Sequence, residues 1–430
     1  MQRQYWRFYW PLALTGVVLL VGRQFQNGVL ASYEDPAREL ATYAFAMSVF
    51  MPFGALLVFV PQMSNVLARS PQAHRVCLRF TVALSVALTV PVALLAFAPP
   101  GRAIVGWIFG LDAATLDAVV GYLRLLTPLV LIRGLRQYVT GMLVQDKHTR
   151  TVTALNVLYL GVLIGMLMLG LWLGWRSMVT LMVAQIVAST LHLAMSCVAC
   201  GLRYRYPTNP EHADLTYGET LAFFWPVATT SLMFALTRPV LYAFINRTAQ
   251  AVVTVAALRV AFDFAMLFHA PVNQFRHLFV TFGDRDSAGL RRFMGRVMLA
   301  LTAVMVLVAF TPLGPLVLRR ALNLKADTLE LAVQTMRVLC ATPLVITVRN
   351  YFHGRLLTGR RTGGMALGGI FRVLATCGAA WPLYRLGWLN HATAAAILQV
   401  GFAAEAVVSA AYARWARVSA AQEMAEAAST

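Results

Sequence analysis

The sequence predicts an all-α integral membrane protein with about twelve transmembrane helices in two six-helix lobes. Of its 430 residues, 59% are apolar and 12% are charged, whereas soluble domains average roughly 45–50% apolar and about 25% charged residues. Apolar stretches of about 20 residues or more, the length that crosses a bilayer, follow one another with short polar breaks. Two segments of the first half of the sequence also recur in the second half, at nearly the same distance along the chain. Lipid is therefore the expected solvent, which excludes a disordered chain, a secreted disulfide scaffold and a soluble enzyme.

Six apolar helices are expected before a polar linker and six after it. The first six span residues 7–31, 38–66, 76–98, 117–143, 152–173 and 178–200. The second six span residues 218–246, 251–281, 291–312, 329–357, 364–386 and 389–413. The chain thus divides into an N-terminal lobe (1–200), a cytoplasmic linker (201–217), a C-terminal lobe (218–413) and a cytoplasmic tail (414–430). The first apolar run is a full crossing with no small-residue cleavage site, so no cleavable signal is expected.

The two halves repeat each other. The Phe-Tyr-Trp-Pro segment at 8–11 returns as Phe-Phe-Trp-Pro at 223–226, an offset of 215, and the segment at 136–143 returns at 349–356, an offset of 213. Because each half has an even number of helices, the halves share one orientation and are related by an axis along the membrane normal. We expect a central cleft between the first, second, seventh and eighth helices, with the transport site at the interface of the repeats.

The positive charges predict the orientation and the class of partner. Of the 36 Lys and Arg residues, 18 lie in loops on one side and 8 on the other, which predicts that both termini are cytoplasmic. The formal net charge is +19, but the arginines are spread through apolar runs, which does not fit a water-exposed nucleic-acid surface. We expect a monomer in the plasma (bacterial inner) membrane, with small anionic solutes and membrane lipids as partners and no nucleic acid.

Signatures of catalysis are missing from the sequence. There is no Walker loop, no HExxH motif and no GxSxG motif, so we expect no enzyme, no cofactor and no metal. Cys197 and Cys200 have CxxC spacing, but they lie on an apolar helix without the βαβ context of a redox motif. The informative residues are the charges inside the membrane.

Besides the 26 Lys and Arg residues assigned to the two sides, ten arginines lie inside predicted helices, against two clear intramembrane acids, Asp263 and Glu405. A charged side chain at mid-membrane costs roughly 2.5–3.5 kcal/mol on insertion scales, so pairing, water, lipid phosphate or a ligand must neutralise this excess. Arg372 and Glu405 lie at similar depth on neighbouring helices, which favours a structural pair, and three arginines near helix ends are suited to snorkelling. The ten are Arg23, Arg124, Arg133, Arg136, Arg238, Arg259, Arg276, Arg337, Arg349 and Arg372.

Two groups of these arginines are candidates for substrate binding. Arg23 and Arg238 occupy matching repeat positions about 6–9 Å outward of their helix midpoints, and Asn27 lies near the first. Arg136 and Arg349 belong to a second group about 5–9 Å inward of the midplane. We interpret them as an outer and an inner basic station along one passage, with helix packing as the alternative for each.

Asp263 and His269 are candidates for ion coupling. Asp263 lies four residues after Arg259, so an ion pair within one helix is the simpler interpretation and is favoured. The alternative makes Asp263 and His269 protonatable groups that couple transport to a gradient of H⁺ or Na⁺.

The arrangement of two six-helix lobes resembles the multidrug/oligosaccharidyl-lipid/polysaccharide exporter superfamily. Within it, four segments look like the progressive ankylosis protein family: 41–48 (ATYAFAMS), 237–240 (TRPV), 244–247 (FINR) and 347–349 (TVR). The resemblance implies export of pyrophosphate, nucleoside triphosphates such as ATP, and citrate. It carries Arg238 and Arg349 over as site residues, whereas Arg23 rests on the internal repeat alone.

The expected function is that of a secondary transporter that exports multivalent anions of the citrate, pyrophosphate or nucleotide class by alternating access between the lobes. A flippase for a phosphate-bearing, lipid-linked saccharide is the alternative, because a basic cleft suits either cargo. An exporter of cationic drugs is disfavoured by the shortage of intramembrane acids. A scaffold or receptor is the remaining alternative that involves no transport.

Overall fold

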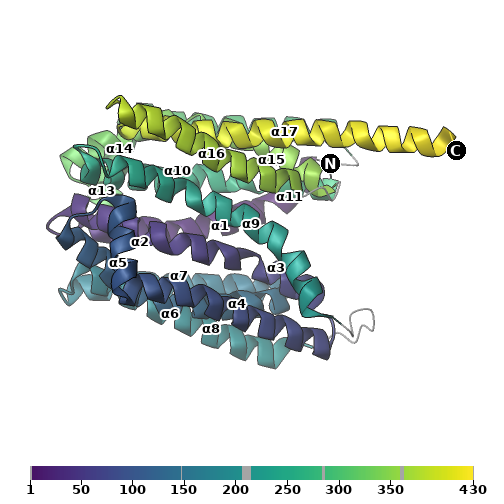
Figure 1. The fold of residues 1–430 in the computed structure, drawn as a ribbon, viewed down its shortest axis with the longest axis horizontal. Helices are drawn as coiled ribbons and strands as arrows, with labels where there is room; N and C mark the ends of the chain where they lie inside the picture. The colour runs from purple at the N-terminus through teal and green to yellow at the C-terminus, as the bar shows by residue number, and fades with distance from the viewer. Residues whose placement is uncertain (1, 147, 206–214, 283–285, 359–362, 430) are drawn as a thin grey trace. The chain divides into compact units, whose positions relative to one another are not determined.

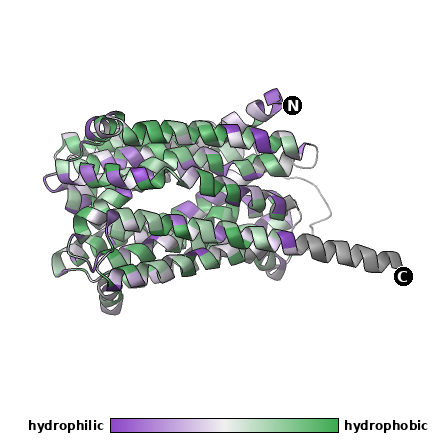
Figure 2. Ribbon diagram, turned by 90° about the horizontal axis from the view of Figure 1, so that it is seen from above, coloured by the Kyte–Doolittle hydropathy of each residue, from purple (hydrophilic) through white to green (hydrophobic). Residues whose placement is uncertain are grey.

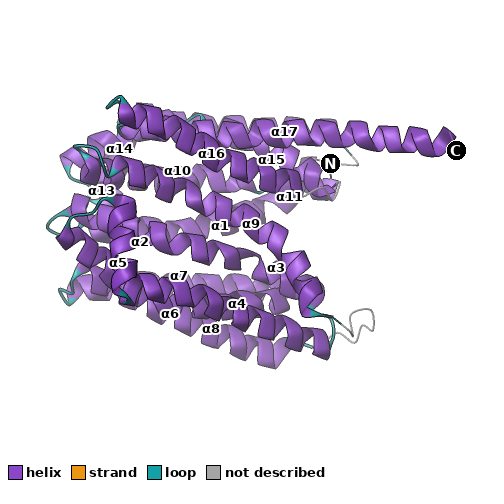
Figure 3. Cartoon of the chain, viewed as in Figure 1, coloured by secondary structure: helices purple, strands orange, loops and turns teal. Residues whose placement is uncertain are grey.

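A computed structural model of the protein describes residues 2–146, 148–205, 215–282, 286–358 and 363–429 (Figure 1). This part of the chain consists of helices joined by short loops, without strands (Figure 3). Helix α1 (Gln2–Ala31) comes first. The following elements are α2 (Pro36–Leu56), a 3₁₀ turn (Leu57–Phe59), α3 (Val60–Leu67), α4 (Pro71–Phe97), α5 (Pro99–Phe109), α6 (Ala113–Gln145), α7 (Thr149–Trp172), α8 (Ser177–Arg203) and α9 (Tyr217–Ile245). The remaining elements are α10 (Ala251–Asn273), α11 (Phe275–Phe282), α12 (Ser287–Phe310), α13 (Leu313–Leu322), α14 (Ala326–Leu339), α15 (Thr342–Thr358), α16 (Gly363–Arg385) and α17 (His391–Ser429).

The long helices have the length and composition of membrane spans. Within the described residues, ten helices meet both criteria, and α14 and α15, bent by 42° at a short break, meet them when taken together. Helix α1 has 30 residues, or about 45 Å at 1.5 Å per residue, which exceeds the roughly 30 Å of bilayer hydrocarbon. Apolar residues predominate along these helices (Figure 2). Many large apolar side chains are exposed on them, including Leu94, Leu299 and Val407, as expected for surfaces that face lipid.

The structure corrects several predicted helix boundaries. The predicted helices 38–66 and 251–281 are each broken, near Leu57–Phe59 and Gln274. The predicted helix 329–357 is divided between Leu339 and Thr342, where α15 begins with Pro343 in its first turn, because proline has no N–H to continue the hydrogen-bond ladder. Two short helices, α5 and α13, occupy segments expected to be loops. Helix α17 continues to Ser429, past the predicted end at 413.

The sequence repeat is present in the geometry. Arg124 Nε donates to the Ala96 carbonyl at 3.1 Å, and Arg337 Nε donates to the Ala309 carbonyl at 3.2 Å. Both arginines and both acceptors are related by the offset of 213. The Arg124 guanidinium also lies over the ring of Phe97 at 5.7 Å, as the Arg337 guanidinium lies over the equivalent Phe310 at 5.5 Å. The two halves therefore anchor equivalent helix ends by the same contacts.

The short helices end in the same way in both halves. Helix α5 ends at Gly110 (φ +65°) and α13 at Asn323 (φ +50°), both in the left-handed region. Gly174 (φ +67°) and Gly387 (φ +70°), after α7 and α16, form a second equivalent pair. Each pair is again 213 residues apart, and glycine and asparagine are the residues that adopt this conformation at least cost.

The chain forms two compact units whose boundaries differ from the predicted lobes. Phe25–Arg247 form one, called here the N-terminal unit, and residues up to Gln24 with those from Thr248 onward form the other, the C-terminal unit. The first helix of each sequence half thus belongs to the unit formed mainly by the other half. The predicted boundaries at 200 and 218 follow the sequence repeat and differ from these packing units. A change in composition identifies the linker between the repeats, but it does not show which helices pack against one another.

Aromatic contacts place the start of α1 in the C-terminal unit. Tyr5 and Tyr9 are each 1% exposed and pack in one cluster with Phe275 and Phe293. The Tyr5 hydroxyl donates to Asp286 Oδ2 at 2.9 Å. Tyr5 and Tyr9 are thus among the largest fully buried side chains of this unit.

Helix α9 is placed in the N-terminal unit by its packing on α2 and by contacts at its end. Asn246 Nδ2 donates to the Phe109 carbonyl at 2.7 Å, and Arg247 Nη2 donates to the Trp107 carbonyl at 2.7 Å. Near its beginning, Phe224 packs edge-on against Phe80 with ring centroids 5.6 Å apart. Both ends of α9 are therefore held by helices of the first sequence half.

Candidate functional site

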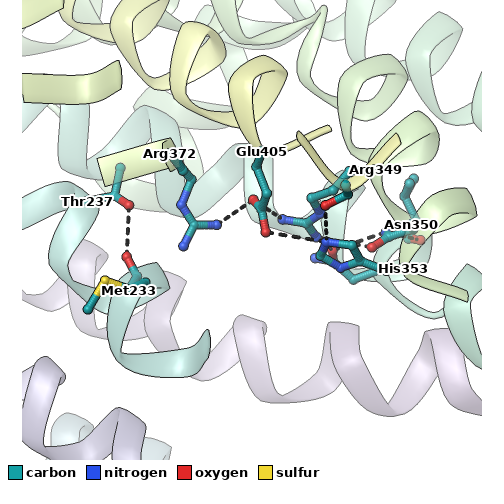
Figure 4. A network of polar contacts seen from close by, with 10 residues as sticks. Met233, Thr237, Arg349, Asn350, His353, Arg372 and Glu405 are labelled. Atoms are coloured by element: carbon teal, nitrogen blue, oxygen red, sulfur yellow. Dashed lines mark hydrogen bonds and ion pairs between the residues drawn. The ribbon is translucent and has the colours of Figure 1, made fainter. Parts of the chain in front are cut away.

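Glu405 is the centre of a buried charge cluster in the C-terminal unit (Figure 4). Its Oε2 accepts from Arg372 Nη1 at 2.6 Å and from Arg349 Nη1 at 3.3 Å. The three residues come from α17, α16 and α15, and they are 2%, 1% and 6% exposed for Glu405, Arg372 and Arg349. Both guanidinium groups lie 5.8 Å from the ring centroid of Phe402. One carboxylate is thus shared by two arginines, and the predicted Arg372–Glu405 pair is confirmed.

Polar groups at the break after α10 complete this cluster. Arg349 Nη2 donates to Asn273 Oδ1 at 2.6 Å and to Asn350 Oδ1 at 3.2 Å, and Asn350 Nδ2 donates to the Val272 carbonyl at 2.9 Å. Such a break frees backbone carbonyls, which need partners because hydrocarbon offers none. Four helices are therefore joined at one point by charge-assisted hydrogen bonds, which are roughly twice as strong as neutral ones.

His353 lies near the other oxygen of the Glu405 carboxylate, beside Arg349 (Figure 4). Its Nε2 is 3.7 Å from Glu405 Oε1 and 3.2 Å from Ser409 Oγ, and its side chain is buried. The sequence reasoning missed His353, Asn350 and Asn273. The i,i+4 spacing of Arg349 and His353 on one helix face is a signal that could have identified His353.

The two candidate coupling residues have different surroundings on α10. Asp263 Oδ2 lies 3.8 Å from Arg259 Nη2, one turn away, and both side chains are buried, which confirms the predicted pair within one helix. His269 is completely buried, and neither of its ring nitrogens has a hydrogen-bond partner in the described structure. The role of both residues in coupling stays a prediction.

A second cluster, in the N-terminal unit, surrounds Arg136. Its Nη1 is 3.0 Å from His192 Nδ1, and its guanidinium lies 5.6 Å from the ring centroid of Tyr159. Because a guanidinium has no acceptor, His192 Nδ1 must accept, so His192 is neutral with its proton on Nε2. Two consecutive hydrogen bonds hold the Tyr159 hydroxyl. Gln26 Nε2 donates to Gln185 Oε1 at 2.8 Å, and Gln185 Nε2 donates to the Tyr159 hydroxyl at 2.9 Å.

These two clusters occupy equivalent places in the repeat. The offset of 213 that aligns Arg136 with Arg349 also aligns His192 with Glu405 and Tyr159 with Arg372. The contacts are equivalent as well, since both the Arg136–His192 and the Arg349–Glu405 contacts join residues 56 positions apart. The sequence reasoning missed His192 and Tyr159, although extending the same offset along the chain would have found them.

The residues of the predicted outer station are divided between the units. Arg23 is partly buried in the C-terminal unit, whereas Asn27, which is completely buried, and Arg238, which is partly buried, belong to the N-terminal unit. The pairing of Arg23 with Arg238, and the central cleft, stay predictions. No group of three or more His, Cys, Asp or Glu residues suited to a metal ion occurs among the residues that the structure describes.

Solved structures with the same fold are membrane transporters. The chain is similar to an inward-facing conformation of a multidrug resistance MATE family transporter of the MOP superfamily, with a TM-score of 0.76 and 15% identity over 96% of this chain and 99% of that one. It is also similar to a MOP superfamily transporter from Pyrococcus furiosus Vc1, with a TM-score of 0.65 and 16% identity over 95% of each chain. The lipid II flippase MurJ, in an inward closed conformation, matches with a TM-score of 0.64 and 12% identity over 93% of this chain and 86% of that one.

These similarities confirm the predicted fold of about twelve transmembrane helices in two lobes, and with it a multi-pass membrane protein. The family comes from the sequence comparison. The model of the progressive ankylosis protein (ANKH) family matches residues 2–289, a range that includes Arg23, Arg136 and Arg238 and ends before Arg349. Since this match covers about two thirds of the chain, the protein belongs to the progressive ankylosis protein family.

Proposed function

We propose that this protein is a secondary transporter that exports multivalent anions, of the citrate, pyrophosphate or nucleotide class, by alternating access between its lobes. The observation that carries the proposal is the excess of positive charge that the sequence predicts for the membrane interior, ten arginines against the two acids Asp263 and Glu405. Both acids lie beside arginines, Asp263 next to Arg259 and Glu405 between Arg349 and Arg372. Neither acid is therefore available to hold a cationic cargo, and an anionic cargo would offset the remaining charge.

The fold supports a transport mechanism of this kind. Repeats that share one orientation place the site at their interface, and alternating access follows when one lobe moves as a body against the other. The relative from Pyrococcus furiosus is described as having a binding pocket of reverse polarity that suggests a different function. This relative supports the idea that the fold accepts cargoes of different charge.

Export of a phosphate-bearing, lipid-linked saccharide is the second candidate. It is favoured by the similarity to the lipid II flippase MurJ, and a basic site would suit a phosphate in either cargo. The two functions differ in the apolar groove that a lipid tail requires. A flippase would also act on a substrate that never leaves the membrane.

A transport assay with purified protein in liposomes tests the proposal. Radiolabelled citrate, pyrophosphate, ATP and a lipid-linked saccharide are compared under imposed gradients of H⁺ and of Na⁺, with protein-free liposomes as the control. We expect uptake of at least one soluble anion, driven by one of the two gradients. Movement of the lipid-linked saccharide alone would establish the flippase, and movement of none of the four would contradict both functions.

Arg23 and Arg238 are the outer residues that we propose for binding. If both hold one multivalent anion, replacing either with Gln should weaken binding about tenfold to hundredfold, because a hydrogen bond to a charged group contributes about 1.5–3 kcal/mol and about 1.4 kcal/mol corresponds to tenfold. Lys at either position should also weaken binding, since it keeps the charge but loses the planar fork. Calorimetric titration of the purified variants measures the effect. Unchanged affinity with a lowered melting temperature would assign both arginines to packing.

A further inference from the structure

We propose that Arg136, His192 and Tyr159 form an anion site inside the N-terminal unit, where a carboxylate or phosphoryl group of the cargo binds as the Glu405 carboxylate binds in the C-terminal unit. This inference rests on the proposed function and deepens it, because it names the groups that hold one charged end of the cargo. The site is built from three helices: α6 carries Arg136, α7 carries Tyr159 and α8 carries His192.

The repeat supplies the first argument. In the C-terminal unit, the position equivalent to His192 holds Glu405, and that carboxylate neutralises Arg349 and Arg372. In the N-terminal unit the same position holds a neutral imidazole, whose contact with Arg136 offers an acceptor but no negative charge. In the C-terminal unit, Glu405 therefore supplies the negative charge that has no counterpart among the side chains around Arg136 in the N-terminal unit.

The charge of Arg136 supplies the second argument. Among the described residues, no carboxylate forms an ion pair with Arg136, and its guanidinium is partly buried in a spanning helix. An arginine in this position costs roughly 2.5–3.5 kcal/mol on insertion scales unless it is compensated. A cargo anion would supply this compensation when bound, and water would supply it when the site is empty.

Donors that remain free supply the third argument. The hydrogen bond of Arg136 to His192 uses Nη1, and the described residues provide no hydrogen-bond partner for Nη2. The Tyr159 hydroxyl accepts from Gln185, which leaves its own proton to donate, and His192 keeps a donor at Nε2. Tyr159 and His192 have ring centroids 5.6 Å apart, and the Arg136 guanidinium lies 5.6 Å from the Tyr159 ring centroid, so the three donor-bearing side chains are neighbours. Charge-assisted hydrogen bonds from such a set are what a carboxylate or phosphoryl oxygen requires.

A buried hydroxyl next to this cluster is a further observation. Ser196 lies one turn after His192 on α8, is completely buried, and has no hydrogen-bond partner for Oγ in the described structure. Its repeat equivalent, Ser409, lies one turn after Glu405 and contacts His353. Buried hydroxyls usually have a hydrogen-bond partner, so Ser196 Oγ is a hydrogen-bonding group beside the N-terminal cluster that the neighbouring side chains do not satisfy.

Binding measurements on the purified full chain test this site. The probes are citrate for the carboxylate source and inorganic pyrophosphate for the phosphoryl source, titrated by calorimetry. We expect Arg136→Gln to lower the affinity for the probe at least tenfold. His192→Glu should lower the affinity by at least as much, because the new carboxylate would pair with the Arg136 guanidinium as Glu405 pairs with Arg349 in the other unit. His192→Gln, which keeps a neutral acceptor for Arg136, should weaken binding of the probe less than His192→Glu does, because it brings no negative charge to compete with the anion.

Arg124→Gln is the matched control, since it removes an arginine from the same helix that bonds to the Ala96 carbonyl near a helix end. Its affinity should equal that of the unchanged protein. Unchanged affinity of Arg136→Gln overturns the inference, and if Arg23→Gln or Arg238→Gln still weakens binding, the proposed function stands without this site. If the unchanged protein binds neither probe and transports no anion, the proposed function fails and the inference fails with it. Should His192→Glu not fold, Arg136→Gln and Tyr159→Phe, which removes the phenol donor, decide the question.

Discussion

Equivalent arginines in the two units have different partners, and only one of them is neutralised by a carboxylate. Arg349 is 6% exposed and bonds to a carboxylate and two asparagines, whereas Arg136 is partly buried and faces a neutral histidine. One repeat position thus carries a closed, internally paired charge in the C-terminal unit and an open one in the N-terminal unit. The residue 56 positions further along the chain thus decides whether this arginine is paired with a carboxylate or with a neutral side chain.

The framework around these arginines differs much less between the units. Arg124 and Arg337 anchor equivalent helix ends, and Gly110 and Asn323 end equivalent short helices. The divergence is concentrated where α6, α7 and α8, or their equivalents α15, α16 and α17, bring polar side chains together. Substitutions at equivalent positions are therefore the sharpest way to test the comparison.

The largest effect is expected for Glu405→Gln. It leaves Arg349 and Arg372 buried without a carboxylate, and removing one partner of a buried ion pair typically costs about 3–5 kcal/mol. The melting temperature in detergent should fall by many degrees. The matched variant is His192→Gln, which removes no charge and should leave the melting temperature nearly unchanged. Equal effects of the two variants would contradict the distinction between a closed and an open cluster.

The next effect concerns the arginines themselves. Arg349→Gln removes one of the two guanidinium groups on Glu405 and the 2.6 Å hydrogen bond to Asn273 Oδ1, and hydrogen bonds to a charged group contribute about 1.5–3 kcal/mol each. Arg136→Gln should cost less than about 1 kcal/mol, because it relieves an uncompensated charge as it removes a contact. Thermal unfolding of both variants measures the difference. A larger loss for Arg136→Gln would assign Arg136 to the scaffold.

A moderate effect is expected where the short helices end. Gly110→Ala should cost about 1–2 kcal/mol, since an alanine is strained in the left-handed conformation. An added Cβ would meet Arg247 Cγ at 3.6 Å and Arg247 Nε at 3.9 Å, which are ordinary van der Waals contacts, so the backbone conformation and not a clash sets this cost. Gly110→Asn should cost less, because Asn323 adopts the same conformation in the other half. A lower melting temperature for Gly110→Asn than for Gly110→Ala would show that the ends of α5 and α13 are not equivalent.

The smallest effect is a pH dependence at the start of α6. Asp112 accepts hydrogen bonds from Thr115 N at 2.7 Å and Thr115 Oγ at 2.8 Å, and these bonds lower the pKa of its carboxyl below the usual range. A lowered pKa in the folded state stabilises the fold above the unfolded pKa, about 3.9, and this contribution is lost as the pH falls through the folded value. Asp112→Asn keeps a capping acceptor without the titration. The difference in melting temperature between Asp112→Asn and the unchanged protein should therefore shrink as the pH falls from about 5 to about 3. In free energy of unfolding, this change amounts to a few tenths of a kcal/mol, because the carboxyl is so exposed. A constant difference across this range would contradict the assignment.

Part of the site could be predicted from the sequence. The Arg372–Glu405 pair and the Arg259–Asp263 pair follow from depth and helical spacing, and both contacts are present. The position of Arg136 and Arg349 follows from the repeat. The partners of Arg349 on α10 could not be predicted, because they depend on where that helix breaks. The neutral tautomer of His192 could not be predicted either, since it follows from a contact between two helices.

The sequence by itself determined the membrane as solvent, the spanning helices and the twofold repeat, because hydropathy and internal similarity are properties of the chain that packing does not change. Only the tertiary structure decided which unit each helix joins, as α1 and α9 show. It also decided which arginine receives a carboxylate. The physical reason is that lipid imposes the same apolar composition on every span, whereas the choice among helix partners depends on side-chain contacts between residues far apart in the chain.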